Sequence, residues 1–170
     1  QDVTSLTAGA DAVRDFTITL TAVNGPVTFA KNPDMAKEGA CAARLAAGLS
    51  KPREVMLTDD ATDMISDSKG GTGEKAARAS GAPWVHYHGV VDGKKIGFAI
   101  LNHPAGFRHP TDWHVRNYGL FAANPWVLKG EQTLAKGESV TLAYRLYVHG
   151  GGLADGKVPD VFAGYANAKA

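Results

Sequence analysis

The chain has little of what several functional classes require. Its 170 residues contain one cysteine, Cys41, so a disulfide bond within the chain is excluded. No motif surrounds Cys41, and we expect a small core residue there rather than a nucleophile. The 18 basic and 17 acidic residues form no dense basic run, so the charge pattern predicts no nucleic-acid partner. No apolar run approaches the roughly 20 residues that cross a bilayer, so we expect no membrane-spanning segment.

The length and the first residue give two further expectations. A chain of 170 residues fits one soluble domain with its own core, so we take residues 1–170 as a single domain. The chain begins at Gln1 rather than at methionine. Removal of a secretory signal peptide is the commonest natural cause of such a start, so a periplasmic or secreted location is the expectation.

Two segments alternate in the manner of half-buried β-strands. In residues 14–23, apolar side chains face one way and threonines the other. In residues 139–149 the alternation is equally clean. The apolar face holds Val140, Leu142, Tyr144, Leu146 and Val148, and the other face holds Thr141, Arg145, Tyr147 and His149.

A third unit is predicted to be a hairpin around Asp92-Gly93, a strong two-residue turn signal between residues 83–91 and 94–103. This turn pairs Val91 with Lys94, and the register then sets His88 opposite Gly97 and His86 opposite Ala99. One face carries Trp84, His86, His88, Gly97, Ala99, Leu101 and His103. The other face carries Val85, Tyr87, Ile96, Phe98 and Ile100, and we expect it to face the core.

The remaining segments give weaker signals. Residues 32–49 are alanine-rich and favour a helix on composition alone, although Gly39 and Gly48 interrupt them. Residues 59–80 are polar and predict a long surface excursion, and residues 159–170 predict a short terminal helix or a frayed end. Several strands with turn signals and little helix predict a mostly β fold. We expect a β-sandwich of antiparallel sheets with few short helices.

The histidine face of the hairpin suggests a metal site. His86 and His88 alternate along one strand, so their side chains project side by side, and His103 would supply a third nitrogen. A divalent metal is the one cofactor that this pattern suggests. The alternative is a polar face that a loop covers, with each imidazole hydrogen-bonded.

The segment from residue 103 to residue 119 is dense in functional side chains. Trp113 offers a flat apolar face that would stack on a sugar ring, and Arg108 and Arg116 carry paired donors for oxygen atoms. Histidines in this segment would move protons near neutral pH. The alternative is structural: Trp113 fills the edge of the core, and Arg116 satisfies loop carbonyl groups.

Four pieces of the sequence resemble the bacterial PmoA-like family, which is also labelled methane oxygenase PmoA-like. They are residues 84–89 (WVHYHG), 97–104 (GFAILNHP), 110–125 (PTDWHVRNYGLFAANP) and 142–150 (LAYRLYVHG). Weaker similarity extends back to about Phe16. A membrane methane monooxygenase subunit needs spanning helices, so the label does not describe this chain. The resemblance implies a β-supersandwich of the kind found among sugar mutarotases.

The resemblance also implies a carbohydrate-related role. His103, Trp113, His114, Arg116 and His149 match its motif positions. Family domains carry a first half with a His-His-Arg-x-Leu-Trp motif, which this sequence lacks. The chain therefore looks like the C-terminal half of the domain, and another polypeptide would supply the rest if the cleft needs both halves.

Two functional hypotheses remain, and whether the chain is an enzyme stays open. In the first, an exported protein binds or processes a saccharide. His103 or His114 would serve as acid or base, and the sugar contacts would come from Trp84, Arg108, Trp113, Arg116, Arg145 and His149. In the second, the chain is a non-catalytic accessory subunit that docks another protein. No paired carboxylates at a glycosidase spacing and no Ser-His-Asp or Cys-His signature are visible in the sequence.

Overall fold

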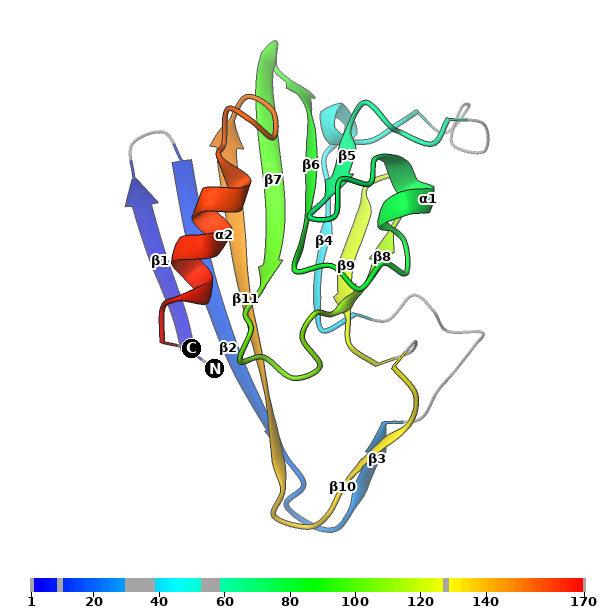
Figure 1. Cartoon of the computed structure of the whole chain (residues 1–170), viewed down its shortest axis with the longest axis vertical. Coiled ribbons are helices and arrows are strands. Elements are labelled where there is room, and N and C mark those ends of the chain that lie inside the picture. Colours follow the sequence, from blue (N-terminus) through cyan, green and yellow to red (C-terminus); the bar gives the residue numbers. More distant parts are fainter. Residues whose placement is uncertain (1, 9–10, 30–38, 53–58, 127–128, 170) are drawn as a thin grey trace.

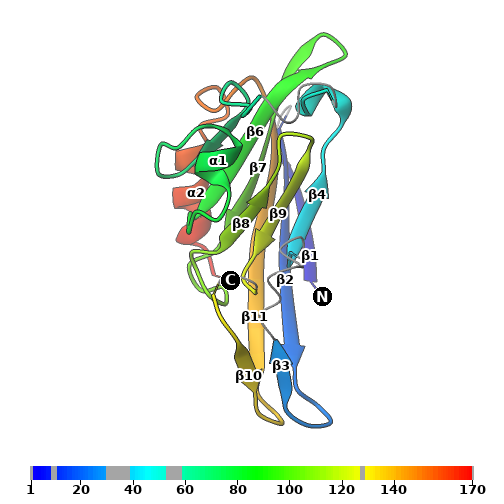
Figure 2. The ribbon, with the colours of Figure 1, turned by 90° about the vertical axis from the view of Figure 1, so that its right-hand side faces the viewer.

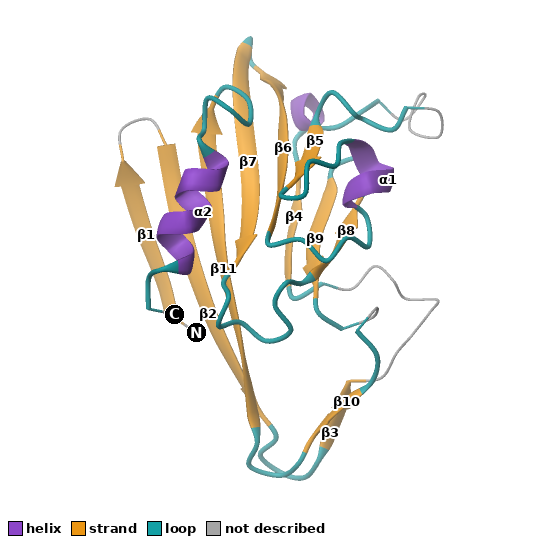
Figure 3. Cartoon of the chain, viewed as in Figure 1, coloured by secondary structure: helices purple, strands orange, loops and turns teal. Residues whose placement is uncertain are grey.

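The protein is seen here in a computed structural model that describes residues 2–8, 11–29, 39–52, 59–126 and 129–169. These residues form a mostly β fold of antiparallel sheets with a few short helices, as the sequence predicts (Figure 3). The largest sheet has six strands (Figure 1). In spatial order they are β1 (Asp2–Ala8), β2 (Asp11–Thr21), β11 (Ser139–Gly150), β7 (Lys94–Asn102), β6 (Trp84–Val91) and β5 (Ile65–Asp67).

The second layer of the sandwich is a smaller sheet. It has three strands in the order β4 (Cys41–Arg44), β9 (Leu120–Asn124) and β8 (Asp112–Val115). A separate ribbon pairs β3 (Val27–Phe29) with β10 (Gln132–Leu134). The helices in the described segments are the 3-10 turn η2 (Ala47–Leu49), α1 (Gly73–Ala77) and α2 (Val158–Ala166). Within the described ranges, no helix is long and apolar enough to cross a membrane.

The β6–β7 hairpin has the predicted register. Val91 pairs with Lys94, His88 with Gly97 and His86 with Ala99. Asp92 and Gly93 both have positive φ, the backbone conformation that a two-residue hairpin turn of this kind requires. Because side chains alternate along a strand, this register also fixes which residues face each side of the large sheet.

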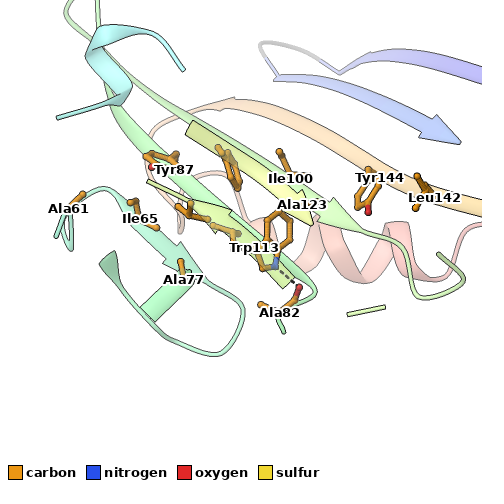
Figure 4. Close-up of a cluster of buried hydrophobic side chains, with 13 residues drawn as sticks. Ala61, Ile65, Ala77, Ala82, Tyr87, Ile100, Trp113, Ala123, Leu142 and Tyr144 are labelled. Atoms are coloured by element: carbon orange, nitrogen blue, oxygen red, sulfur yellow. Dashed lines mark hydrogen bonds between the residues drawn. The ribbon is translucent and has the colours of Figure 1, made fainter. Parts of the chain in front are cut away.

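The main core lies between the two sheets (Figure 4). Its largest side chains are Trp113 and Phe121 from the small sheet and Tyr87, Ile100 and Tyr144 from the large sheet. The predicted inward face of the hairpin therefore packs as expected. Burial of aromatic side chains of this size makes the contact between the sheets a main source of stability.

A second apolar cluster lies on the outer face of the large sheet. There, α2 covers Trp84, Leu101 and Tyr147 with its own Val158 and Tyr165. A view along the sheet shows α2 on one side of the six strands and β4, β9 and β8 on the other (Figure 2). The predicted terminal helix is thus present, and it docks onto the sheet rather than fraying.

Two sequence expectations need correction. The alanine-rich stretch is not helical where it is described: Cys41–Arg44 is strand β4, and Ala47–Leu49 is a single 3-10 turn. Residues 32–38 of that stretch lie outside the described residues. The polar excursion of residues 59–80 contains β5 and α1, so it is more ordered than a surface loop.

Candidate functional site

Trp113 does not offer a face to a ligand. Its side chain is 1% exposed, and its ring lies 5.7 Å from that of Phe121 between the two sheets. The indole Nε1–H donates a hydrogen bond to the carbonyl oxygen of Ala82 at 2.8 Å (Figure 4). The predicted sugar platform is therefore a core residue, because the small sheet closes over the face on which Trp113 lies.

Two of the predicted ligand-binding arginines form ion pairs within the fold. Arg116 Nη1 lies 2.6 Å from Glu74 Oε1 in α1. Arg145 binds both carboxylate oxygens of Asp15 at 2.7 and 2.8 Å, and its guanidinium lies 4.4 Å from the Tyr165 ring centroid. A guanidinium that holds a carboxylate through two parallel N–H donors is fixed in position, and its best-aligned pair of donors is already used. These arginines fasten α1 to the small sheet and β2 to β11.

Arg108 has the structural role that the sequence suggested for Arg116. Its Nη1 donates to the carbonyl oxygens of Pro125 at 2.9 Å and Gly130 at 3.0 Å. Arg108 thereby supplies donors to backbone acceptors that follow β9. The sequence predicted this kind of contact but placed it on the wrong arginine.

His103 and Trp84 hold α2 in place. His103 Nδ1 accepts the Ala105 N–H at 3.1 Å, so Nε2 carries the proton and donates to the carbonyl oxygen of Ala168 at 3.1 Å. The His103 ring also packs edge-on against Tyr165, with 4.8 Å between ring centroids. Both nitrogens are thus engaged in the contact with the C-terminal helix, and neither is placed as an acid or base for a ligand.

His114, the other predicted acid or base, lies on β8 opposite Ala122 and is buried. The loop before β8 is organised by a residue that the sequence reading missed. The Oδ1 atom of buried Asn102 accepts the His109 Nδ1–H at 2.9 Å and the Thr111 N–H at 3.0 Å. The polar residues of this region therefore form a supporting network for the loop.

The predicted histidine face contains a close imidazole pair. His86 Nε2 and His149 Nε2 are 3.1 Å apart, and the planes of the two stacked rings are inclined at 15° to each other. His149 Nδ1 lies 2.9 Å from the Gly150 carbonyl oxygen, which can only accept, so His149 carries its proton there. His149 Nε2 is then the acceptor, and His86 Nε2–H is the donor.

Glycines make room for this pair. A Cβ atom at Gly97 would lie 2.1 Å from Cε1 of His149, and a Cβ at Gly156 would lie 2.3 Å from the same atom. The His149 ring therefore fills the space that two glycines leave.

Desolvation is the main reason that the pKa of His86 falls to about 3, and the neighbouring His149, His88 and Lys95 lower it further. At neutral pH, His86 is uncharged.

The predicted metal ligands are not brought together. His88 stacks beside His86 with 5.6 Å between centroids, whereas His103 contacts Ala105, Tyr165 and Ala168 instead. Among the described residues, no group of three or more His, Cys, Asp or Glu side chains is arranged to hold a metal ion. The structure therefore brings His86 and His88 side by side, as predicted, but directs His103 to the contact with α2.

A different surface is left open on the inner side of the large sheet. The small sheet packs on the large sheet, and its edge strand β4 lines a hollow together with Phe16 and Ile18 of β2. Among the described residues, we call the incompletely covered apolar surface of β2 and β11 the open face. It consists of Phe16, Ile18, Leu20 and Leu146, which are half-buried, and Val148, which is exposed.

Three surface hollows run along the open face. The largest, of about 450 Å³, is lined by Ile18, Leu20 and Leu142 together with Phe29 and Trp126. The second shares Ile18 with the first, and the third shares Leu146 with the second. The three hollows are therefore one continuous apolar surface, and Arg14 is the one charged residue among the described residues that line them.

Cys41 lies beside this surface and is not an activated nucleophile. It is half-buried and lines the second hollow with Phe16 and Tyr144. Desolvation raises the pKa of its thiol to about 12. The thiol is therefore protonated at neutral pH, in agreement with the expectation of a small packing residue.

Comparison with known proteins gives a family but no activity. The model of a family described as a family of unknown function, DUF6807, matches residues 2–163. No curated protein and no solved structure matches the chain.

Proposed function

Because the chain belongs to the DUF6807 family, which has no assigned activity, we propose a function from its geometry: a non-catalytic subunit that docks a protein through the open face. The observation that carries this proposal is the continuous apolar surface along β2 and β11. Its outermost residue, Val148, is 36% exposed. Contiguous apolar surface of this kind is typical of protein–protein contact sites.

The polar residues support the same choice. The three arginines and His103 all bind groups of the chain itself, and Trp113 is buried. A catalytic or sugar-binding site needs convergent polar groups that can reach a ligand. Among the described residues that line the open face, Arg14 is the one charged residue and no polar groups converge, whereas the apolar side chains match the centre of a protein interface.

The carbohydrate role, the likeness to PmoA-like proteins and the export of the chain stay predictions. Calorimetry with a panel of mono- and oligosaccharides tests the first of them directly. Heat of binding that Arg116→Ala abolishes would support a sugar site in this region. The geometry supports it less than docking, because the predicted sugar platform is enclosed.

Photo-crosslinking tests the docking proposal. A photoreactive benzophenone side chain replaces Ile18 on the open face in cells that make the protein, and a matched chain carries it at Val90. Val90 is 57% exposed at the far end of β6, away from the open face. We expect a discrete adduct of higher mass from position 18 and none from position 90. Absence of an adduct from position 18, or equal adducts from both positions, would contradict the proposal.

A further inference from the structure

We propose that the His86–His149 pair is an acid-sensitive switch. Protonation of the pair releases the loop of residues 151–157, which joins β11 to α2, together with the first turn of α2 (Figure 1). The pair lies on the outer face of the large sheet, on the side away from the open face. Val158 of that turn is fully buried in the apolar cluster beneath α2, so release of the turn uncovers part of this cluster.

The His149 ring is held between two backbones. On the sheet side, a Cβ atom at Gly97 would lie 2.1 Å from its Cε1, and on the loop side, a Cβ at Gly156 would lie 2.3 Å from its Nδ1. The loop is fastened at the same place, because the Tyr147 hydroxyl donates to the Gly156 carbonyl oxygen at 3.0 Å. The ring therefore cannot turn away from His86 unless the backbone at Gly156 moves.

The closed pair has no suitable place for an additional proton. His86 Nε2–H already donates to His149 Nε2, and His149 Nδ1–H donates to the Gly150 carbonyl oxygen. The remaining position is His86 Nδ1, which is buried and has no partner among the described residues. A proton on His149 Nε2 would instead set two N–H donors 3.1 Å apart and remove their hydrogen bond. Either position leaves a buried positive charge with an unpaired donor, which is unfavourable.

The titratable groups around the pair come from each element packed against it. They are His88 of β6, Lys95 of β7, Tyr147 of β11, Asp155 of the loop and Asp63, which precedes β5. Lys95, and His88 once it is protonated, oppose a positive charge on His86. The carboxylates of Asp155 and Asp63 act on His88 instead. Among the described residues, no carboxylate therefore offsets a proton on His86.

The size of the effect follows from the two states of His86. In the released state water reaches the ring, which then titrates near pH 6.5. In the closed state, mainly because of desolvation, the pKa of His86 is about 3. Between these two values the released state binds more protons, so acid favours release. His86 alone raises the population of the released state about 25-fold from pH 7 to pH 5.

Hydrogen exchange of the full chain at pH 7 and pH 5 tests the switch. The reporters are amides hydrogen-bonded within the loop and the first turn of α2, namely Gly156, Lys157, Asp160 and Val161. Protection factors correct for the intrinsic pH dependence of exchange. We expect those of the reporters to fall about 25-fold at pH 5. The amides of β8 and β9 should stay better protected than the reporters at both pH values, because the sandwich remains closed.

Two glutamine variants assign the effect to the pair. His86→Gln keeps an N–H donor but does not titrate, so the fall in reporter protection should shrink to about threefold or less. His88→Gln is the matched control: it lies two residues away on the same strand and forms no part of the pair, so it should retain most of the fall. Circular dichroism confirms that each variant is folded.

Two results of the exchange experiment would overturn the switch: unchanged reporter protection in the native chain at pH 5, or an equal fall in His86→Gln. Nitrogen NMR of the imidazoles adds a readout that needs no variant. Both rings of the pair should stay uncharged at every pH at which the loop amides keep their closed-state signals. A charged His86 ring alongside closed-state loop signals would contradict the proposal.

Discussion

Replacing Trp113 with alanine is expected to lower the free energy of unfolding by about 3–5 kcal/mol, the usual cost of removing a large buried aromatic side chain. Trp113 is 1% exposed and is among the largest fully buried side chains of the described residues. The variant leaves a cavity between the two sheets and removes the hydrogen-bond donor to the Ala82 carbonyl oxygen. Chemical denaturation followed by far-ultraviolet circular dichroism measures the change.

Trp113→Phe is the matched control. It keeps much of the ring but removes the indole N–H, so we expect a smaller loss, because the Ala82 carbonyl oxygen loses its donor while most of the packing remains. A ligand-stacking tryptophan would behave differently. If Trp113→Ala left stability unchanged and removed binding of a saccharide, the structural role described above would be wrong.

Acidification is expected to lower the free energy of unfolding through His86, and this is the second large effect that we predict. In the unfolded chain, histidine titrates near pH 6.5, whereas the folded environment lowers the pKa of His86 to about 3. Between these values the unfolded state binds more protons, so stability is complete above pH 6.5 and falls as the pH drops toward 3. One such group contributes about 1.4 kcal/mol per pH unit inside that window.

The measurement compares the free energy of unfolding against pH for the native chain and for His86→Gln. Glutamine retains an N–H donor but does not titrate, so the curve of the variant should be flatter between pH 6.5 and pH 4. Its stability at pH 7 can differ without affecting the comparison, because the slope is the readout. Parallel curves would show that His86 does not carry the acid sensitivity.

The fold was predictable where local chemistry decides the geometry. Asp92-Gly93 fixes a two-residue turn, and that turn fixes the register of the whole β6–β7 hairpin, including His88 opposite Gly97. The alternation of apolar and polar residues along 139–149 also predicted both faces of β11 correctly. On its outer face lie Tyr147 and His149, and on its inner face lie Leu142 and Tyr144.

The site was not predictable because its partners are distant in sequence. Arg116 pairs with Glu74, 42 residues away, and Arg145 pairs with Asp15, 130 residues away. Residue spacing carries no signal for such pairs, so the arginines looked available for a ligand. The expectation that Trp113 offers its ring to a sugar fails for a related reason. Alternation gives the side of a strand on which a residue lies, but not whether another layer covers that side.

The sequence did not predict the open face, because its residues have the pattern of core residues. Phe16, Ile18 and Leu146 alternate as core residues do, and the pattern predicts that they are buried. They are only half-buried, because they lie at the margin of the core, beside hollows that the described residues leave in the surface. How completely a second layer covers a strand is a property of the tertiary structure, and alternation along the strand does not reveal it.

Trp84 and Trp113 lie on opposite faces of the same six-stranded sheet, under covers of different kinds. A nine-residue helix shields Trp84, whereas a whole second sheet encloses Trp113. The smaller cover buries less surface, so we expect α2 to open at a lower free energy than the sandwich. Such an opening would expose the indole of Trp84 to water while that of Trp113 stays enclosed.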